Sequence, residues 1–356
     1  MPERVYMNFN EDAVTFESII GRQPRSIIFD AEEISNLRDE RILVTGAGGS
    51  IGSQIIKIIA GIEGVNYLAT DRDEGALHSL SLELDSRALF ESPQIALLDI
   101  RDQVGVNKIL SSFKPTLIIH AAALKHLNAL QKQPREATLS NVFGTANLVD
   151  AAIMHGIPKF VNISTDKAAE PKNVLGYSKK MAELYVAKAR ADGHFGYTSC
   201  RFGNVFNSRG SVIETFIYQI LNDKPITLTH PKIERFFMSI EEAAYLTLKS
   251  ALINNGDVHI FDMGEPVPLA EIIENLQSVL SHRSSVLVTG LRDGEKMSED
   301  LFGLTEESFT TIEPRIKYAN LSIELNKNVK LLNQINSRDE SSINRELSGM
   351  TTLTKL

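Results

Sequence analysis

The chain has 356 residues, of which 43% are hydrophobic and 23% charged, so it is long enough to bury the core of a large α/β unit together with a smaller lobe. Its net charge of −8 and its pI near 5.6 argue against a nucleic-acid partner held on a basic surface. The one cysteine, Cys200, excludes an internal disulfide framework and fits a reducing compartment. Because Cys200 lies in an apolar run, we expect it to fill the core rather than to act as a nucleophile.

The two ends of the chain are polar. The first residues, MPERVYMNFNEDAV, lack the apolar segment of a secretion signal, and no apolar run approaches the about 20 residues that span a bilayer. We therefore expect a cytoplasmic protein with no membrane span in this chain. The segment 336–356 is rich in Ser, Thr and Asn, and we expect it to form a flexible tail.

Short apolar runs alternate with amphipathic segments over residues 39–204, after an N-terminal extension, 1–38, that we expect to be helical. The runs predicted as strands are 41–46, 66–71, 94–99, 116–122, 159–165 and 197–203, and the segments predicted as helices are 50–62, 74–90, 102–113 and 178–192. Strands that alternate with helices are typical of a parallel, doubly wound sheet with right-handed crossovers. We therefore predict a Rossmann-like, NAD-binding domain over 39–204.

The regular alternation of strand-like and helix-like segments ends after about residue 205. Helical GSVIETFIYQIL is followed by KPITLT and then by RFFMSIEEAAYLTLKSAL. We expect residues 205–335 to form a smaller α/β lobe that binds the substrate and is partly interleaved with the Rossmann-like domain. The predicted fold class is therefore α/β, a doubly wound parallel sheet with a smaller C-terminal lobe.

A glycine-rich turn, VTGAGGSIGSQ, joins the first predicted strand to the first amphipathic segment. Gly46, Gly49 and Gly52 would let the backbone turn tightly and approach a pyrophosphate, which then sits at the N-terminus of the following helix. A glycine triplet alone is a weak signal. The strand before this one and the helix after it supply the context that dinucleotide binding requires.

The second predicted strand ends in Asp71, 19 residues after Gly52 (71 − 52). A carboxylate at this position accepts hydrogen bonds from the adenosine ribose hydroxyls and repels a 2′-phosphate, so it favours NAD over NADP. Arg72 follows directly and would accommodate a 2′-phosphate, which moderates the preference for NAD.

The segment STDKAAEP ends the fifth predicted strand, at the carboxyl edge where open α/β sheets place their active sites. Thr165 can hold a substrate hydroxyl there, and Asp166 and Lys167 form a candidate acid–base pair. Lys167 acts as a base only if burial and a nearby positive charge lower its pKa. The structural alternative is that Asp166 caps the following loop and Lys167 is solvated.

These motifs resemble those of extended short-chain dehydrogenase/reductases: the TGxxGxxG spacing, LLDIRD (97–102) and HAAALKH (120–126) match cofactor-binding segments of that family. STDKAAEPKNVLGYSKKMAE, RFGNVFNSRGSVI, THPKIERFFMSIEEA and LRDGEKMSEDLF narrow the resemblance to its CapD/WbpM-like polysaccharide-biosynthesis branch, over roughly residues 17–320. Many members of that branch carry an N-terminal membrane domain, and this chain resembles their soluble catalytic part.

The resemblance assigns NAD binding to the glycine turn, to the ends of the second and third strands, to the HAAALKH loop, to a structural Asn and to an active-site Lys. These residues are Gly46, Gly49, Ser50, Ile51, Gly52, Asp71, Arg72, Asp99, Ile100, Ala121, Ala122, Ala123, Asn141 and Lys179. The motifs contain no metal-ligand set, so we expect no metal.

The resemblance implies a hydro-lyase, a UDP-N-acetylglucosamine 4,6-dehydratase. Oxidation at C4 would acidify the C5 proton, and loss of water from C6 with reduction at C6 would give UDP-2-acetamido-2,6-dideoxy-4-hexulose for surface polysaccharide or glycan synthesis. Asp166 would protonate the departing C6 hydroxyl, Lys167 would remove the C5 proton and Thr165 would anchor O4. Lys179 would hold the nicotinamide ribose and lower nearby pKa values. A homodimer or larger homo-oligomer is usual in this superfamily.

A UDP-sugar also needs polar groups and cations for its nucleotide, and Arg recognises a diphosphate bidentately. The residues that the resemblance places at the substrate are Lys125, Asn204, Asn207, Ser208, Arg209, Ser211, Arg235, Arg292 and Glu295. Arg201, in RFGNV, is a further candidate for the diphosphate. Glu214 stands where relatives often have Pro.

The Tyr that this family usually carries four residues before its active-site Lys is replaced here by Leu175. Residues four apart share a helix face and residues two apart do not, so we expect Tyr177 to point elsewhere and to be structural. Some members of the branch carry Met at this position, so Leu175 marks a Tyr-less variant. We hypothesise that Asp166 or Thr165, directly or through a water, takes the O4 proton.

Three other functions stay open at this point. A UDP-sugar 4-epimerase would use the same cofactor and the same C4 oxidation, but it has no use for Asp166 and Lys167. A UDP-N-acetylglucosamine 5,6-dehydratase, which makes an exocyclic alkene, would keep that pair. The non-enzymatic alternative is a sensor that binds the cofactor or a nucleotide sugar and has lost catalysis together with its Tyr.

Overall fold

The computed structural model describes residues 13–25, 28–86, 93–321, 342–343, 345 and 347–349. Most of the tail expected at 336–356 and the first 12 residues of the extension expected at 1–38 lie outside this part of the chain. Contacts divide the chain into two compact units, which are described separately below. Unit 1 comprises residues 1–26, 203–242 and 263–299, and unit 2 comprises 27–202, 243–262 and 300–356.

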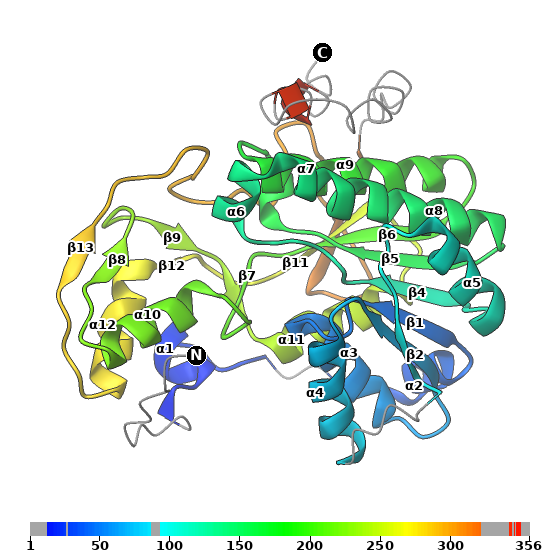
Figure 1. Ribbon diagram of the computed structural model, residues 1–356, viewed down its shortest axis with the longest axis horizontal. Helices are drawn as coiled ribbons and strands as arrows, with labels where there is room; N and C mark the ends of the chain where they lie inside the picture. Colours follow the sequence, from blue (N-terminus) through cyan, green and yellow to red (C-terminus); the bar gives the residue numbers. More distant parts are fainter. Residues whose placement is uncertain are drawn as a thin grey trace. The chain divides into compact units, whose positions relative to one another are not determined.

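Unit 2 is built on a nine-stranded sheet with the strand order β14-β15-β11-β6-β5-β4-β1-β2-β3 (Figure 1). The strands are β1 (Arg41–Thr45), β2 (Asn66–Asp71), β3 (Ile95–Leu97), β4 (Leu117–His120), β5 (Lys159–Ile163), β6 (Gly196–Arg201), β11 (Val258–Phe261), β14 (Phe309–Thr310) and β15 (Ile316–Ala319). β14 and β15 pair antiparallel, as do β15 and β11, and the other neighbours pair parallel. The prediction of a doubly wound parallel sheet is confirmed.

Helices cover both faces of this sheet. In Figure 1, α5, α8 and α9 lie over one face, and α3 and α4 lie over the other. Their buried faces are apolar, and one core cluster joins Leu43 of β1 to Leu110 of α5, Leu148 of α8 and Val186 of α9. Unit 2 contains the helices α2 (Ala31–Arg38), α3 (Ser50–Ala60), α4 (Glu74–Asp85), α5 (Gln103–Phe113), α6 (Leu127–Lys132), α7 (Pro134–Ala137), the π-helix η2 (Thr138–Phe143), α8 (Gly144–Met154), the 3₁₀ turn η3 (Asp166–Ala168), α9 (Val174–Ala191) and most of α11 (Ile240–Ser250).

The six predicted strands are present, but some helices begin or end at residues other than those predicted. α9 begins at Val174 rather than at residue 178, because Asn173 caps it by accepting a hydrogen bond from the Gly176 amide at 2.9 Å. β11, β14 and β15 come from the chain beyond residue 205 and extend the sheet.

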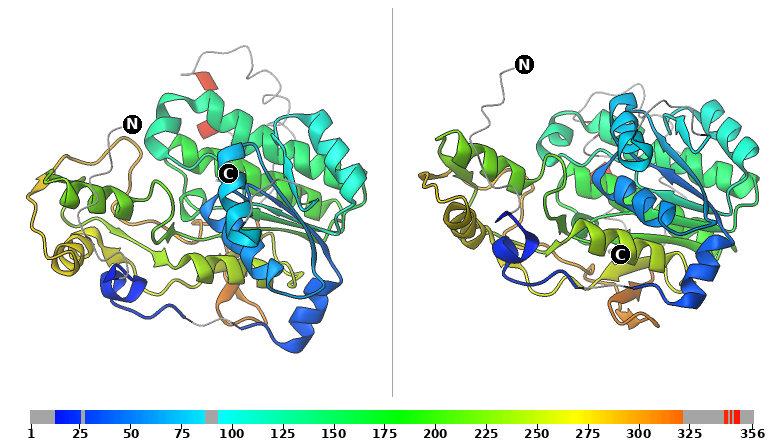
Figure 2. Two further views of the ribbon diagram at one scale, coloured as in Figure 1. Left: turned by 60° about the horizontal axis from the view of Figure 1, so that its bottom comes forward. Right: turned by 90° about the horizontal axis from the view of Figure 1, so that it is seen from below.

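Unit 1 contains α1 (Phe16–Ile20), α10 (Val212–Leu221), α12 (Leu269–Val279) and three strand pairs. Those pairs are β7 (Asn204–Val205) with β10 (Phe237–Met238), β9 (Glu234–Arg235) with β12 (Val267–Pro268), and β8 (Ile226–Leu228) with β13 (Val286–Val288). α1 lies beside α12 in both views of Figure 2, and its Ile19 carbonyl accepts a hydrogen bond from Asn275 at 2.9 Å. The two parts of the extension therefore belong to different units, with α1 in unit 1 and α2 in unit 2.

Two residues of the expected tail are buried. Ile343 and Leu347 are fully buried in a core cluster of unit 2 that includes Val258 of β11 and Ala319 of β15. Apolar residues four apart lie on one face of a helical turn, so even a mostly polar segment can bury this pair. These two side chains therefore belong to the core of unit 2.

None of the helices in the described ranges is long and apolar enough to cross a membrane.

Candidate active site

The glycine turn after β1 is closed by backbone contacts that only glycine allows. Gly46 has a φ of +69°, and a Cβ there would stand 2.5 Å from the Ala122 backbone nitrogen. A Cβ on Gly52 would collide with the Gly46 carbonyl oxygen, and the Gly49 amide donates to that same oxygen at 3.0 Å. α3 then begins at Ser50 with no side-chain cap, so its first-turn amides face a site suited to an anion.

Asp71 ties this turn to the end of β2. Its Oδ2 accepts a hydrogen bond from the Gly48 amide at 3.0 Å, and its Oδ1 accepts one from the Asp73 amide at 3.0 Å. The carboxylate that was predicted to select NAD therefore also holds the glycine turn in place.

A pocket of about 130 Å³ opens between the glycine turn and the ends of the neighbouring strands. Its lining residues are Gly46, Gly49, Asp71, Arg72, Leu98, Asp99, Ile100, Ala121, Ala122, Ala123, Leu124 and Ser140. Five residues assigned to the cofactor do not line it, namely Ser50, Ile51, Gly52, Asn141 and Lys179. Leu98, Leu124 and Ser140 also line the pocket and were not predicted from the sequence.

Ser140 differs from the other lining residues because its Oγ is buried and has no hydrogen-bond partner within the part of the chain that the structure describes. Ser140 lies in the π-helix η2, a form that occurs mostly as short bulges and often at functional sites. No sequence signal marks a π-bulge, so the sequence offered no way to find this hydroxyl.

Asp99 is clamped by a residue that the sequence analysis passed over. Arg101 donates from Nε to Asp99 Oδ1 at 3.0 Å and from Nη2 to Oδ2 at 2.6 Å. This hydrogen-bonded guanidinium holds the pKa of Asp99 below its ordinary value, so the carboxylate stays charged at the rim of the pocket.

Asn141 is fully buried and holds two elements of the site together. Its Oδ1 accepts from the Leu124 amide at 2.8 Å, and its Nδ2 donates to the Leu124 carbonyl and to Ser178 Oγ, both at 3.0 Å. Asn141 therefore fixes the HAAALKH loop against α9 at Ser178, one residue before Lys179. These are the contacts of a structural residue.

The acid–base candidates lie where β5 ends. Asp166 is fully buried, its amide donates to the Phe202 carbonyl at 3.0 Å, and its Oδ1 accepts from Thr165 Oγ1 at 2.9 Å and from Lys167 Nζ at 3.1 Å. Asp166 Oδ2 has no hydrogen-bond partner within the described ranges. A buried carboxyl oxygen without a partner is costly unless a ligand or a proton satisfies it, so this atom is suited to proton transfer.

Two further titratable groups set the electrostatics around the candidate site. Burial lowers the pKa of Lys179 to about 8, against the opposing effect of Glu183. Burial and the positive charge of Lys179 lower the pKa of His120 to about 3. The neutral His120 lies between two hydroxyls, with Nδ1 at 2.8 Å from Thr45 Oγ1 and Nε2 at 3.0 Å from Thr145 Oγ1.

Leu175 stands four residues before Lys179 on α9 and is buried in a hydrophobic cluster with Val174 and Met181. Tyr177 packs against the same cluster while partly exposed. The usual Tyr position is thus occupied by a side chain of the apolar core.

Of the residues assigned to the substrate, Lys125 lies in unit 2, and Asn204, Asn207, Ser208, Arg209, Ser211, Arg235, Arg292 and Glu295 lie in unit 1. Arg235 is buried, donates to the Glu234 and Met297 carbonyls and lies 3.5 Å from the carboxylate of Glu295. Arg209 and Arg292 are exposed.

Glu214, which the sequence left without an explanation, stabilises the start of α10. Ser211 caps this helix by accepting from the Glu214 amide at 3.3 Å, and Glu214 Oε2 accepts from the Gly210 amide at 2.6 Å. This Ser-x-x-Glu arrangement is close to a capping box.

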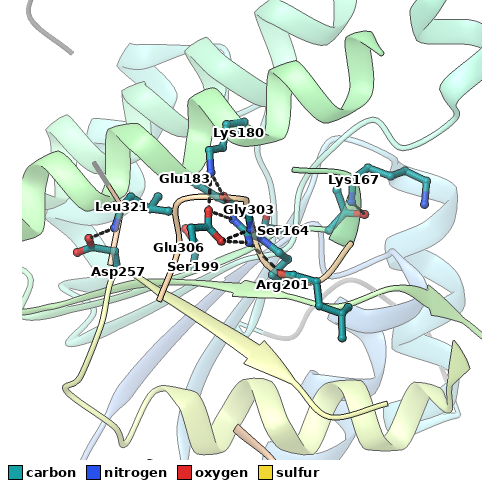
Figure 3. Close-up of polar contacts among 12 residues, drawn as sticks. Ser164, Lys167, Lys180, Glu183, Ser199, Arg201, Asp257, Gly303, Glu306 and Leu321 are labelled. Carbon is teal, nitrogen blue, oxygen red and sulfur yellow. Dashed lines mark hydrogen bonds and ion pairs between the residues drawn. The ribbon is translucent and has the colours of Figure 1, made fainter. Parts of the chain in front are cut away.

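The expectation that Arg201 binds a diphosphate is wrong. Arg201 is fully buried at the end of β6, and its guanidinium is bound by two carboxylates of unit 2, Glu183 and Glu306 (Figure 3). Its charge is neutralised inside the protein, so it is not available to a ligand.

Comparison with known proteins identifies a family whose sequences resemble this chain. The model of the family described as "Polysaccharide biosynthesis protein" matches residues 42–320. The capsular polysaccharide biosynthesis protein CapD of Staphylococcus aureus is 37% identical over 307 residues, 83% of this chain and 50% of that protein. A UDP-glucose 4-epimerase of Rickettsia rickettsii is 31% identical over 332 residues, 86% of this chain and 94% of that protein. The chain spans about half the length of the curated relatives that it matches first.

Solved structures agree on the fold. The structure of Pen from Bacillus thuringiensis has 30% identity and a TM-score of 0.71, over 79% of this chain and 89% of that one. DesIV of Streptomyces venezuelae, a dTDP-glucose 4,6-dehydratase solved with NAD and TYD bound, has 20% identity and a TM-score of 0.64, over 74% of this chain and 88% of that one.

Proposed function

Because the chain belongs to the polysaccharide biosynthesis protein family, we propose that it is a nucleotide-sugar dehydratase that uses NAD and acts on a UDP-N-acetylhexosamine, UDP-N-acetylglucosamine being the first candidate. The product is the UDP-linked 4-keto-6-deoxy sugar. The observation that carries this proposal is the Asp166–Lys167 pair at the end of β5, with a buried Asp166 oxygen left for a ligand or a proton.

The residues around the pocket fit NAD. The Gly46 turn lines the pocket and leads into α3, which has no side-chain cap, Asp71 stands at the end of β2, and the unpartnered Ser140 hydroxyl also lines the pocket. When bound, NAD supplies the hydride acceptor for C4 and the hydride that returns to C6. The neighbour DesIV is an NAD complex, which supports the same cofactor for this chain.

Dehydration then depends on protein groups. A 4-keto sugar has an acidic C5 proton, which Lys167 takes as the base. The C6 hydroxyl leaves as water when Asp166 gives it a proton, so one C5–H bond and one C6–O bond break and one water is released. C5 regains a proton from Lys167 when C6 gains its hydride, which completes the 6-deoxy sugar. Thr165 holds O4, and its hydroxyl donates to Asp166 at 2.9 Å, which gives the O4 proton a route to a carboxylate where Leu175 offers none.

A UDP-sugar 4-epimerase is the second candidate, because the Rickettsia relative carries that name and matches over nearly its whole length. Epimerisation changes C4 alone. Its O4 proton can take the same route to Asp166, but it gives Lys167 no C5 proton to remove and Asp166 no leaving C6 hydroxyl to protonate. The pair therefore favours dehydration.

Incubation with UDP-N-acetylglucosamine, followed by NMR and mass spectrometry of the products, separates the candidates. The dehydratase gives a 4-keto-6-deoxy sugar that is lighter by one water. UDP-N-acetylgalactosamine would establish the epimerase, an exocyclic alkene the 5,6-dehydratase, and unchanged substrate with retained NAD the sensor.

A further inference from the structure

A second buried group of charges lies close to the acid–base pair, and the proposed mechanism does not use it. It consists of Lys180, Glu183, Arg201 and Glu306, all in unit 2, and is named the Arg201 cluster (Figure 3). We infer that the Arg201 cluster is a positioning device, which holds the strand end carrying Thr165, Asp166 and Lys167 in the geometry that proton transfer requires. For its activity readout this inference rests on the proposed function.

The Arg201 guanidinium donates hydrogen bonds to both carboxylates of the cluster. Nε and Nη2 donate to the two oxygens of Glu183 at 3.0 and 2.6 Å, and Nη1 and Nη2 donate to the two oxygens of Glu306 at 2.7 and 3.2 Å. Nη1 also donates to the Leu301 carbonyl at 3.0 Å. Bidentate pairing on two sides fixes the plane of a guanidinium and therefore the orientation of both carboxylates.

Glu183 connects this cluster to the catalytic strand. Its Oε1 accepts a hydrogen bond from Ser164 Oγ at 2.6 Å, and Ser164 directly precedes Thr165. The Ser164 amide donates to the Cys200 carbonyl at 2.6 Å, and the Asp166 amide donates to the Phe202 carbonyl at 3.0 Å. The end of β5 is therefore held by backbone bonds on both sides of Arg201 and by one side-chain bond to the cluster.

Glu306 connects the cluster to the loop that covers the same segment. It accepts from Lys180 Nζ at 2.7 Å and from the Gly303 amide at 2.8 Å. The next residue, Leu304, donates its amide to Glu170 at 2.8 Å, and a Cβ on Gly303 would stand 3.0 Å from the Ala169 carbonyl oxygen. Glu306 thus holds the loop against the residues that follow Lys167.

The cluster also includes neighbours of Lys179. Lys180 follows Lys179 on α9, and Glu183 lies four residues after Lys179, on the same face of the helix. Buried ion pairs contribute little net stability compared with apolar side chains of the same volume, and their better-attested use is to specify one arrangement. This cluster joins α9, β6, the loop at Glu306 and, through Ser164, the end of β5, so the arrangement that it specifies is that of the candidate catalytic groups.

Ser164→Ala tests the inference, because it removes the hydrogen bond from the strand end to Glu183 and leaves all four charges of the cluster paired. We expect kcat with UDP-N-acetylglucosamine to fall about tenfold, since small displacements of reacting groups have large effects on rate. KM and the amount of NAD retained should stay within about twofold of wild type, because the residues that bind them are unchanged.

Lys249→Met is the matched control. It breaks ion pairs of the same unit, 2.8 Å to Glu33 and 3.3 Å to Glu313, and none of these residues belongs to the segment from Ser164 to Lys179. Its melting temperature should fall measurably while its kcat stays near wild type. If the control loses as much kcat as Ser164→Ala, the loss reflects general destabilisation and the inference is overturned.

Hydrogen exchange of the protein without substrate provides a readout that does not depend on the proposed function. Ser164→Ala should speed exchange of the Asp166 and Ala168 amides, which bond to the Phe202 and Thr165 carbonyls, and Lys249→Met should not. Unchanged exchange together with unchanged kcat would refute a positioning role. If wild-type protein does not turn over UDP-N-acetylglucosamine, the proposed function fails, and the exchange experiment alone then decides on positioning.

Discussion

Charged groups are buried at the carboxyl ends of two adjacent strands of unit 2, and they are satisfied to different degrees. At the end of β6, Arg201 is bound by two carboxylates and a backbone carbonyl. At the end of β5, Asp166 accepts hydrogen bonds at Oδ1, while its Oδ2 has no partner within the described ranges. Complete pairing indicates a structural role, and an unpaired buried oxygen indicates a role toward a ligand. Changes at the two positions should therefore differ in what they affect most, which is activity at Asp166 and stability at Arg201.

Asp166→Asn should have the largest effect on catalysis. An amide cannot give a proton to the C6 hydroxyl, so kcat for the 4-keto-6-deoxy product should fall about 10³-fold, within the range that general acid–base catalysis supplies. The free energy of unfolding should stay the same or rise, because the change removes a charge whose carboxylate is incompletely paired. Product formation by NMR and urea unfolding measure the two quantities. A variant that keeps full activity would show that Asp166 is not the acid.

Arg201→Met should have the largest effect on stability. It leaves Glu183 and Glu306 buried without their counter-charge, and breaking a buried pair in this way costs about 3–5 kcal/mol of stability. Urea unfolding measures the loss, with Lys249→Met as a comparison, because the less buried Lys249 pairs should cost only about 1 kcal/mol. Equal losses in the two variants would contradict a special role for the cluster.

Leu175→Tyr tests whether a Tyr at position 175 can act as the catalytic group that the family usually carries there. Because Leu175 packs in the hydrophobic cluster, the larger and polar side chain should lower the free energy of unfolding by about 1–3 kcal/mol and should bring no gain in rate. Leu175→Met conserves volume and should cost less than about 1.5 kcal/mol. A rate gain of about tenfold or more in the Tyr variant would show that the pocket accepts the usual mechanism.

Ser140→Ala should have the smallest effect. If the free hydroxyl in the pocket bonds to the cofactor, its loss should weaken NAD binding about fivefold, the equivalent of about 1 kcal/mol, with little change in stability. Fluorescence titration with NADH measures the affinity. Ser250→Ala, at a buried serine that does not line the pocket, should leave it unchanged. Equal affinities in the two variants would remove Ser140 from the cofactor site.

The features that sequence predicted well are local ones. The Gly46 turn follows β1, Asp71 is the last residue of β2, and the Asp166–Lys167 pair stands shortly after β5, so the order of the chain places them at the same edge of the sheet. The chain positions of Leu175 and Lys179 likewise fix their shared helix face.

The features that sequence missed depend on partners far along the chain. Arg201 resembled a free diphosphate ligand because its carboxylates lie 18 and 105 residues away, at Glu183 and Glu306. Ser140 is placed by a π-helix, and Ile343 and Leu347 are buried by tertiary packing against β11 and β15. Local composition holds no information about such contacts.

The most direct test of the proposed chemistry is to run the reaction with UDP-N-acetylglucosamine in D₂O and to read deuterium at C5 of the product by NMR. Wild-type protein should give a 4-keto-6-deoxy sugar with solvent deuterium at C5, and Lys167→Met, which lacks the base, should give neither product nor C5 exchange. A C4 epimer with hydrogen retained at C5, or full C5 exchange in the Lys167 variant, would contradict the assignment of Asp166 and Lys167 to dehydration.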